Sequence, residues 1–467
     1  MFYSLQTNWQ FVILFIGLLA AAIINWRKPG CGAWLIFFLS PLYLLKIGNW
    51  PLTVLEALMW LFIGVWLVRK VKNSCHPGLD PGSRPWIPAF LASGSMTFAG
   101  MIRGVITKVI KSDIFLPPLL ILAGVFISAV FSPDPKTGLG ILKSWFLAPM
   151  IFAFILRDIF EGGGLKEMFS ALFVSSAAVA AISFVYLASG HLTFDGRLTA
   201  FYLSPNHLAM YLAPGLLVGL ALWSDAKKTH QRILLFIGYC LLATVLYATY
   251  SFGAWLGLAA AAVLILFYLW RLKLMSRRQL LMVICLSVIL FIFVLGQQLF
   301  DVNNDKLSNL FSSPRSSWQS RLMVWQAATQ ILKDHGFLGI GPGLFQNYYL
   351  EYQQYFSVPY LEWAVPQPHN LFLAWWLQAG LAGLVGFFWL LIVFFRRGFK
   401  TLKKPSFVPL GGTSEGKQNH LWIIILMAVM TYFLVHGLVD TTFWKNDLAL
   451  IWWVIVFLGS RAGRRVY

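Results

Sequence analysis

The stretch that decides the fold runs from Arg315 to Gly383 and reads RSSWQSRLMVWQAATQILKDHGFLGIGPGLFQNYYLEYQQYFSVPYLEWAVPQPHNLFLAWWLQAGLAG. Most of it is rich in polar, aromatic and turn-forming residues, whereas uninterrupted apolar segments flank it on both sides. A chain that is otherwise mostly apolar has few other places for polar chemistry. We therefore expect this excursion to form a unit at a membrane surface and to carry the function.

The composition is that of a polytopic membrane protein. Of the 467 residues, 59% are hydrophobic and 11% are charged, whereas soluble domains carry about 25% charged residues. The net charge of +19 does not indicate nucleic acid, because the basic residues lie in short loops between apolar runs. The four cysteines form no CxxC pair, which argues against disulfides and structural zinc.

Thirteen apolar segments are long enough to be candidate spans, since a helix needs about 20 residues to cross a bilayer. They are 10–25, 32–47, 52–68, 114–131, 142–157, 168–189, 206–223, 232–250, 252–270, 279–297, 370–395, 420–439 and 445–460. Basic loops mark the cytoplasmic side, and alternation then puts the loops 132–141, 190–205, 298–369 and 440–445 outside. We expect an all-α protein with 12 or 13 transmembrane helices and a large helical outer loop.

This topology gives three regions. Residues 1–297 form the first ten spans, with a proline- and glycine-rich cytoplasmic insertion at 74–101; residues 298–369 form the outer loop; and residues 370–467 form the last three spans and a basic tail. Within the loop, apolar residues at helical spacing predict an amphipathic helix from Trp318 to Asp334, with Gly336 as its C-terminal cap. The glycines 339, 341 and 343 predict a turn, and the tyrosines after it predict a second helix.

The predicted outer face collects polar residues that are far apart in sequence. They are Arg197, Asn206, Arg321, Trp325, His369, Asn370, His436 and Asp440. We expect His436 and Asp440 to share one helix face, because they are four residues apart. Asp301 and Asp305 are also four apart, but nothing nearby supplies further ligands, so no metal site is expected.

These residue types suit transfer of a sugar from a lipid pyrophosphate to a hydroxyl. Arginine grips a pyrophosphate through two N–H groups, and a neutral histidine can take a proton from a hydroxyl. Each residue also has a structural explanation: Arg197 and Arg321 could be interfacial charges reaching lipid headgroups, and His369 could simply begin a helix. The tyrosines could form an aromatic belt rather than a sugar platform.

Three motifs resemble the O-antigen ligase and O-antigen polymerase family of bacterial membrane glycosyltransferases. They are Ser-Arg321-Leu-Met-Val-Trp325-Gln, the turn Gly-Phe-Leu-Gly-Ile-Gly-Pro-Gly-Leu-Phe, and Pro-His369-Asn370-Leu-Phe-Leu. Gly196-Arg197 with Pro205-Asn206, and His436-Gly-Leu-Val-Asp440, look like other parts of the same pattern. Where the family often shows Ser-Arg-Gly, this chain has Ser251-Phe252-Gly253, which removes a positive charge.

The resemblance implies a GT-C-like, metal-independent transferase without a cofactor, in the bacterial inner membrane, with its active face in the periplasm. The donor would be an undecaprenyl-diphosphate-linked glycan, and the acceptor a glycolipid of the lipid A–core type or another glycan. His369 would be the catalytic base and Arg197 and Arg321 the pyrophosphate-binding pair. A ligase is the first expectation; a polymerase or a protein oligosaccharyltransferase of the same family, and a glycolipid flippase from another class, are the alternatives.

Overall fold

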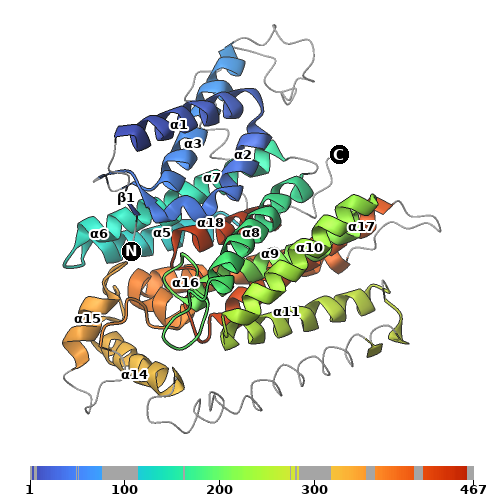
Figure 1. Cartoon of the computed structure of the whole chain (residues 1–467). Coiled ribbons are helices and arrows are strands. Elements are labelled where there is room, and N and C mark those ends of the chain that lie inside the picture. The colour runs from blue at the N-terminus through green and yellow to red at the C-terminus, as the bar shows by residue number, and fades with distance from the viewer. Residues whose placement is uncertain are drawn as a thin grey trace.

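The part of the chain that the structure describes is mostly α-helical and contains the long apolar helices of a membrane protein (Figure 1). The computed structural model describes residues 3–4, 8–48, 50, 52–75, 114–160, 164–273, 275–278, 281–282, 317–353, 363–403 and 414–459. Its two strands, β1 Tyr3–Ser4 and β2 Leu45–Lys46, are only two residues long and pair in parallel. The all-α polytopic fold expected from the sequence is confirmed.

Eight of the described helices are long and apolar enough to cross a membrane, counting the continuous helical segment 135–159 as one, and three shorter helices are apolar as well. The helices are α1 Asn8–Arg27, α2 Pro29–Phe38, α3 Val54–Cys75, α5 Leu116–Val130, α6 Pro135–Ile141, α7 Ala148–Ile159, α8 Leu165–Ala188, α9 Pro205–Asp225, α10 Thr229–Ala248, α11 Phe252–Arg271, α14 Ser317–His335, α15 Phe345–Tyr352, α16 Leu371–Lys403, α17 Ser414–His436 and α18 Asn446–Gly459. Two irregular turns interrupt them: the 3₁₀ turn η1 Ser40–Leu44 and the π-helical turn η3 Leu142–Leu147.

The prediction of one span over 32–47 is wrong. Helix α2 ends at Phe38, and the chain continues as η1 and then β2. Pro41 is the reason, because proline has no N–H for the helical ladder and its ring crowds the carbonyl four residues earlier. Most of the predicted span 279–297, and residues 76–101 of the predicted insertion, lie outside the described residues.

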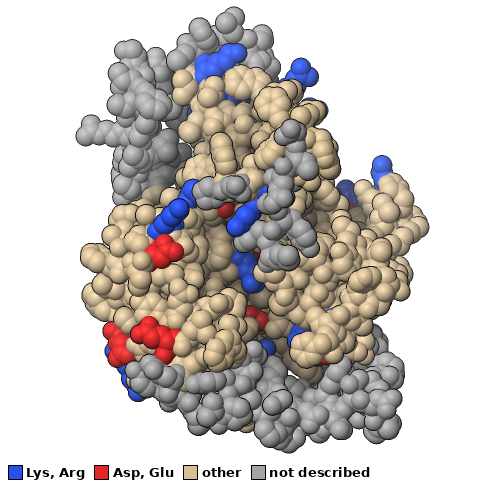
Figure 2. Space-filling model, turned by 60° about the vertical axis from the view of Figure 1, so that its left-hand side comes forward, with Lys and Arg blue, Asp and Glu red and all other residues tan. Residues whose placement is uncertain are grey.

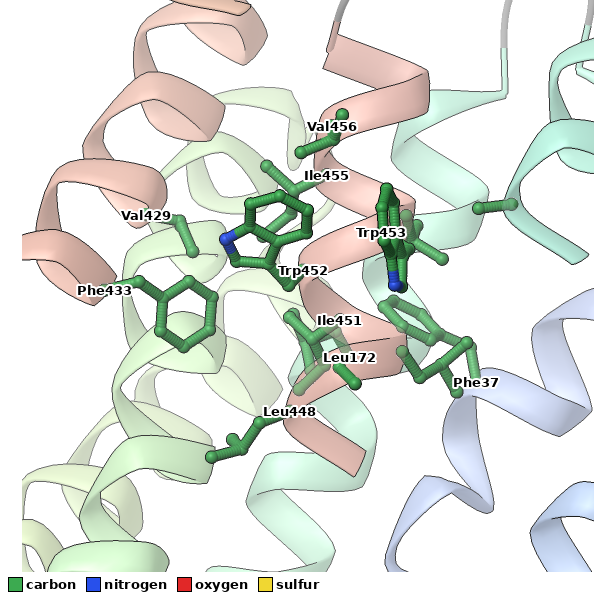
Figure 3. Packing of buried hydrophobic residues seen from close by; sticks show 14 of the residues in the cluster. Phe37, Leu172, Val429, Phe433, Leu448, Ile451, Trp452, Trp453, Ile455 and Val456 are labelled. Carbon is green, nitrogen blue, oxygen red and sulfur yellow. The ribbon is translucent and has the colours of Figure 1, made fainter. Parts of the chain in front are cut away.

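Helix α18 lies at the centre of the bundle (Figure 3). Every residue from Asn446 to Leu458 is buried, which is expected of a helix that is apolar on all sides. Figure 3 shows Trp452 and Trp453 pointing to different sides of α18, with Phe433 of α17 and Phe37 of α2 among the neighbours. The helices at the periphery of the bundle are different. In the most apolar 18 residues of α1 and of α10, 89% and 72% of the residues, respectively, are not buried. Uncharged residues, drawn in tan, cover most of the described surface in Figure 2, and exposed apolar side chains such as Phe15 of α1 and Leu234 of α10 are among the surface residues. We therefore expect such surfaces to contact lipid.

The outer loop contains the two helices that the sequence predicts. Helix α14 packs Val324, Ala328 and Ile331 against Phe345 and Tyr349 of α15 in a small core of its own. The two helices are orange in Figure 1 and lie together beside α16. The turn between them is confirmed: α14 ends at His335, directly before Gly336, and Gly339, Gly341 and Gly343 have positive φ values of +77°, +93° and +84°.

Helix α16 is broken at Gly380, and the glycine turn of the outer loop fills the break. Gly380 has φ +65° and ψ −174°, a conformation that favours glycine. The N–H of Leu381 donates to the carbonyl of Phe337 at 3.0 Å, and the N–H of Ile340 donates to the carbonyl of Leu377 at 2.6 Å. Unpaired backbone groups are unfavourable inside a membrane. These two bonds pair backbone groups at the break in α16, and they thereby attach the outer loop to α16.

Candidate active site

Four segments meet at one end of the helix bundle and carry the candidate side chains. Arg197 lies in the turn before α9, and Asn206 is in the first turn of that helix. His369 directly precedes Asn370 and α16, and Asp440 lies in the connection from α17 to α18. Arg321 and Trp325 come from α14. Segments that are up to 243 residues apart in the chain therefore form one hydrogen-bonded group, because Arg197 contacts Asn206 and Asn206 contacts Asp440.

Arg197 is held from three sides. Its Nε–H donates to the carbonyl of Thr249 at 2.9 Å, and an Nη2–H donates to Asn206 Oδ1 at 2.7 Å. Nη1 lies 4.0 Å from a carboxylate oxygen of Asp195. Burial lowers the pKa of Arg197, the carboxylate of Asp195 opposes this, and the nearby charge of Arg321 adds to the lowering. A guanidinium has five N–H donors, so a positioned arginine like this one can still bind an anion.

Asp440 joins the arginine side of the site to the histidine side. One carboxylate oxygen accepts from Asn206 Nδ2 at 2.8 Å, and the other lies 3.5 Å from His369 Nδ1. Burial alone would raise the pKa of Asp440, but contact with His369 and the charges of His436 and Arg321 outweigh it and hold the pKa below its usual value. Asp440 is therefore a carboxylate that can orient His369.

His369 has a strained backbone at the centre of this group. Its φ is +46°, a left-handed conformation that costs a residue other than glycine about 1–3 kcal/mol. Bonds on both sides of it hold that conformation: Trp325 Nε1–H donates to the Pro368 carbonyl at 3.1 Å, and the N–H of Leu371 donates to Gly437 O at 2.7 Å. The His369 side chain remains one-third exposed, so it can meet a substrate.

Asn370 is the N-cap of α16. Its side-chain oxygen accepts from the N–H groups of Phe372 and Leu373, both at 3.0 Å, and its amide donates to the Leu438 carbonyl at 3.0 Å. Asparagine is among the preferred residues for this position. Asn370 thus joins the start of α16 to the connection that carries Asp440. These bonds favour a role for Asn370 in positioning His369 over a role in binding substrate.

Arg321 also reaches this connection, from α14. Its Nε–H donates to the carbonyl of Val439 at 2.9 Å, and its charge acts on both Arg197 and Asp440. The outer loop therefore brings a second guanidinium to the group that Arg197 and Asp440 form.

His436 is placed differently from the expectation. Helix α17 ends at His436, so Asp440 is not on its helical face but in the turn that follows, although its N–H donates to the His436 carbonyl at 3.1 Å. The His436 ring is buried, bonds Tyr432 through Nδ1 at 2.9 Å and packs against Gly253. A Cβ at Gly253 would come within 2.5 Å of that ring, so the glycine permits α11 to approach α17 closely.

Several supporting groups are not apparent from the sequence. The carbonyls of Thr249, Leu438 and Val439 position the polar side chains of the site, and no pattern of residue types reveals a carbonyl. His207 and Asp447 form a buried pair. His207 directly follows Asn206 on α9, and Asp447 is in the first turn of α18. The sequence shows a histidine and an aspartate near the starts of two apolar segments, but nothing in it pairs two residues that are 240 positions apart.

The arrangement can bind an anion beside a histidine that is oriented by a carboxylate. Such a histidine keeps one ring nitrogen for proton transfer, and paired guanidinium groups stabilise a departing pyrophosphate. Within the described ranges, no three potential ligands gather as a metal-binding group; metal independence remains a prediction. Elsewhere, a cavity of about 580 Å³ between α5, α14 and α15 includes Phe131, Phe337 and Tyr348 but none of these site residues.

Residues 237–388 match the family described as O-antigen ligase. The match covers the chain from α10 through the outer loop to the first half of α16, and so includes Arg321, Trp325 and His369. It confirms the resemblance noted in the sequence over this segment and supports a membrane glycosyltransferase of that kind. No curated protein matches the chain.

Proposed function

We propose that this chain is an O-antigen ligase-like glycosyltransferase that moves a glycan from an undecaprenyl-diphosphate carrier to a hydroxyl of an acceptor. The reaction takes place on the periplasmic side of the bacterial inner membrane, where the outer loop lies. The acceptor is a glycolipid of the lipid A–core type. The observation that carries this proposal is the continuous contact from Arg197 through Asn206 and Asp440 to His369, with Arg321 bound to the adjoining Val439.

In the proposed reaction, Asp440 holds the Nδ1–H of His369 and leaves Nε2 to accept a proton. The acceptor hydroxyl attacks the anomeric carbon of the donor sugar, and its proton passes to Nε2. The new C–O bond forms as the bond between that carbon and the pyrophosphate oxygen breaks. Undecaprenyl diphosphate leaves with the electron pair, and Arg197 and Arg321 stabilise its negative charge.

A polymerase or a protein oligosaccharyltransferase could use the same groups, because all three reactions join a pyrophosphate-activated sugar to a nucleophile. The lipid-linked glycan in cells lacking the gene distinguishes the first two. Long chains that accumulate on the carrier indicate a ligase, whereas single repeat units indicate a polymerase. A flippase is less well supported, since the polar residues gather at one end of the helices rather than at their middle.

The direct test is glycan transfer by the purified protein from an undecaprenyl-diphosphate glycan to a lipid A–core acceptor. We expect His369→Ala and Arg321→Ala each to reduce the rate at least about a hundredfold, since each removes a group that acts in the transition state. Two substitutions serve as matched controls: His191→Ala in the loop before α9, and Lys333→Ala on α14. Both residues are exposed, and both variants should retain the rate.

Retained transfer by folded His369→Ala protein would refute the assignment of the base. If the intact protein transfers glycan to another glycan or to a protein but not to lipid A–core, the reaction class stands and the acceptor is wrong. Failure of the intact protein with all three acceptors would refute the proposed function.

A further inference from the structure

His207 and Asp447 form a buried pair beneath the proposed active site. His207 Nε2 lies 3.2 Å from both carboxylate oxygens of Asp447, and both side chains are completely buried. The hydroxyl of Tyr43 lies 3.3 Å from the ring nitrogens of His207, and the ring of Tyr202 packs against the imidazole with centroids 4.5 Å apart. The proposed reaction does not use this pair.

A buried histidine–carboxylate pair contributes little net stability to a membrane helix bundle. Removing two such groups from water costs several kcal/mol, and apolar residues of similar volume often do as well or better. Such a pair is therefore better explained by the geometry that it specifies than by the stability that it adds.

The pair is directly connected to the site. Asn206 and His207 are adjacent in the first turn of α9; Asn206 bonds Asp440, and His207 bonds Asp447. The segment from Asp440 to Asp447 is thus attached to one helical turn at both of its ends. Asp447 is also fixed on its own side, because its Oδ1 accepts from the N–H of Leu448 at 2.9 Å.

The same segment continues into a second polar contact. Asn446 Nδ2 donates to Glu56 of α3 at 3.2 Å, and Glu56 lies 3.5 Å from Lys143 Nζ in the π-helical turn η3. The start of α18 is therefore held from α9 on one side and from α3 on another.

We propose that His207 and Asp447 are positioning residues for the transfer reaction: they hold the 440–447 segment so that Asp440 faces His369. The proposal rests on the proposed function. It differs from a purely structural role in what it predicts for catalysis. Loss of the pair should slow the chemical step, because Asp440 would no longer orient the base, while the donor should still bind, because Arg197 keeps its bond to the Thr249 carbonyl.

The decisive variant replaces both members, His207→Leu with Asp447→Leu. Removing one partner leaves the other buried and unpaired, which is strongly destabilising, whereas replacing both removes that cost. Lys445, whose charge Asp447 also stabilises, keeps the neighbouring charge of Asp440 in the double variant. We expect the double variant to fold, to lose about tenfold to a hundredfold in kcat, and to keep the donor KM within about twofold of the intact protein.

Conservative variants provide the rescue. In His207→Gln the amide can still donate to Asp447, and in Asp447→Asn the amide oxygen can still accept from His207. Both should keep kcat within about threefold of the intact protein. Tyr211→Phe is the matched control, because Tyr211 is one turn further along α9, is buried and bonds Ser40 and Ser175 at 2.8 and 2.7 Å. That substitution should lower the unfolding temperature without changing kcat.

The measurements are steady-state transfer rates per folded protein and thermal unfolding in detergent. A folded double variant with the intact protein's kcat would overturn the inference, as would conservative variants as slow as the double one. If the double variant does not fold, a loss of about tenfold or more in kcat in both conservative variants would overturn it, because each keeps a hydrogen bond between positions 207 and 447. Absence of transfer by the intact protein would instead remove the proposed function, and the inference with it.

Discussion

At the scale of single residues, the unusual backbone of His369 is the feature that most directly suggests function. A left-handed φ of +46° at a histidine persists only where surrounding bonds hold it, and here Trp325, Asn370 and Leu371 all take part. Ala200, three residues after Arg197, and Tyr250, directly after the Thr249 whose carbonyl binds Arg197, also have positive φ values. Strained backbone therefore occurs on both the arginine and the histidine side of the site.

Asp440→Asn tests the orientation of His369. An amide can present an N–H to His369 Nδ1 where the carboxylate accepts one, so the substitution favours the wrong tautomer of the ring. We expect kcat to fall about a hundredfold or more, with a smaller change in the donor KM. Transfer assays with purified protein measure both. An unchanged kcat in folded protein would mean that the 3.5 Å approach between His369 and Asp440 has no catalytic role.

The same aspartate makes folding stability depend on pH. Because its pKa is lower in the folded protein than the usual 3.8, the ionised form contributes stability that is present above pH 3.8 and is lost as the pH falls toward the folded value. Between about pH 5 and about pH 3 the intact protein should therefore lose more unfolding free energy than Asp440→Asn. Denaturant titrations in detergent at the two pH values measure the difference. Equal losses would show that Asp440 is not stabilised as a carboxylate.

At the scale of elements, the break in α16 is what connects the outer loop to the membrane helices. Gly380→Ala tests it. An alanine Cβ there would lie 2.6 Å from the Leu338 carbonyl oxygen, and the positive φ adds strain, so we expect a loss of at least about 1–3 kcal/mol. Gly64→Ala is the control, because Gly64 is exposed within α3, and an added Cβ would have no neighbour within 4 Å apart from the backbone of its own helix.

Gly64→Ala should be neutral or stabilising by up to about 1 kcal/mol, since alanine has the higher helix propensity. Thermal unfolding of both variants in the same detergent provides the comparison. If Gly380→Ala unfolds at the same temperature as the intact protein, the bonds from Leu381 to Phe337 and from Ile340 to Leu377 do not constrain the break.

Elements were predictable wherever a period or a turn residue defined them. The apolar spacing from Trp318 to Asp334 correctly predicts α14, which extends from Ser317 to His335. The prediction of one span over 32–47 is wrong because the segment is mostly apolar, yet Pro41 ends the regular helix. Similarly, four-residue spacing placed His436 and Asp440 on one helix, but spacing alone cannot show that α17 stops at His436.

At the scale of the whole molecule, the predicted alternation of the spans places the candidate residues on one side of the membrane. It does not show which of these residues contact one another. Arg197, Asn206, Asp440 and His369 are indeed in one connected group. Their partners are mostly carbonyls of turns, whose positions depend on how α9, α17 and α18 pack. That packing is determined by side chains such as Trp452 and Phe433 in the core (Figure 3), and no local pattern specifies it.

The membrane orientation is the whole-molecule prediction on which the proposed reaction depends, because the donor must meet the site from the periplasm. Single cysteines can test it after the native Cys31, Cys75, Cys240 and Cys285 have been replaced with serine. His191→Cys and Asn347→Cys report on the predicted outer side, and Lys228→Cys and Arg278→Cys on the predicted inner side. All four positions are exposed, so differences in labelling reflect the membrane and not burial.

In spheroplasts treated with a membrane-impermeant maleimide, we expect the cysteines at 191 and 347 to react and those at 228 and 278 to react only after permeabilisation. The physical reason is that segments rich in lysine and arginine remain in the cytoplasm during insertion, and both inner positions lie in such segments. The opposite pattern would put Arg197, Arg321 and His369 on the cytoplasmic side. A ligase acting on periplasmic acceptors would then be impossible, whatever the geometry of the site.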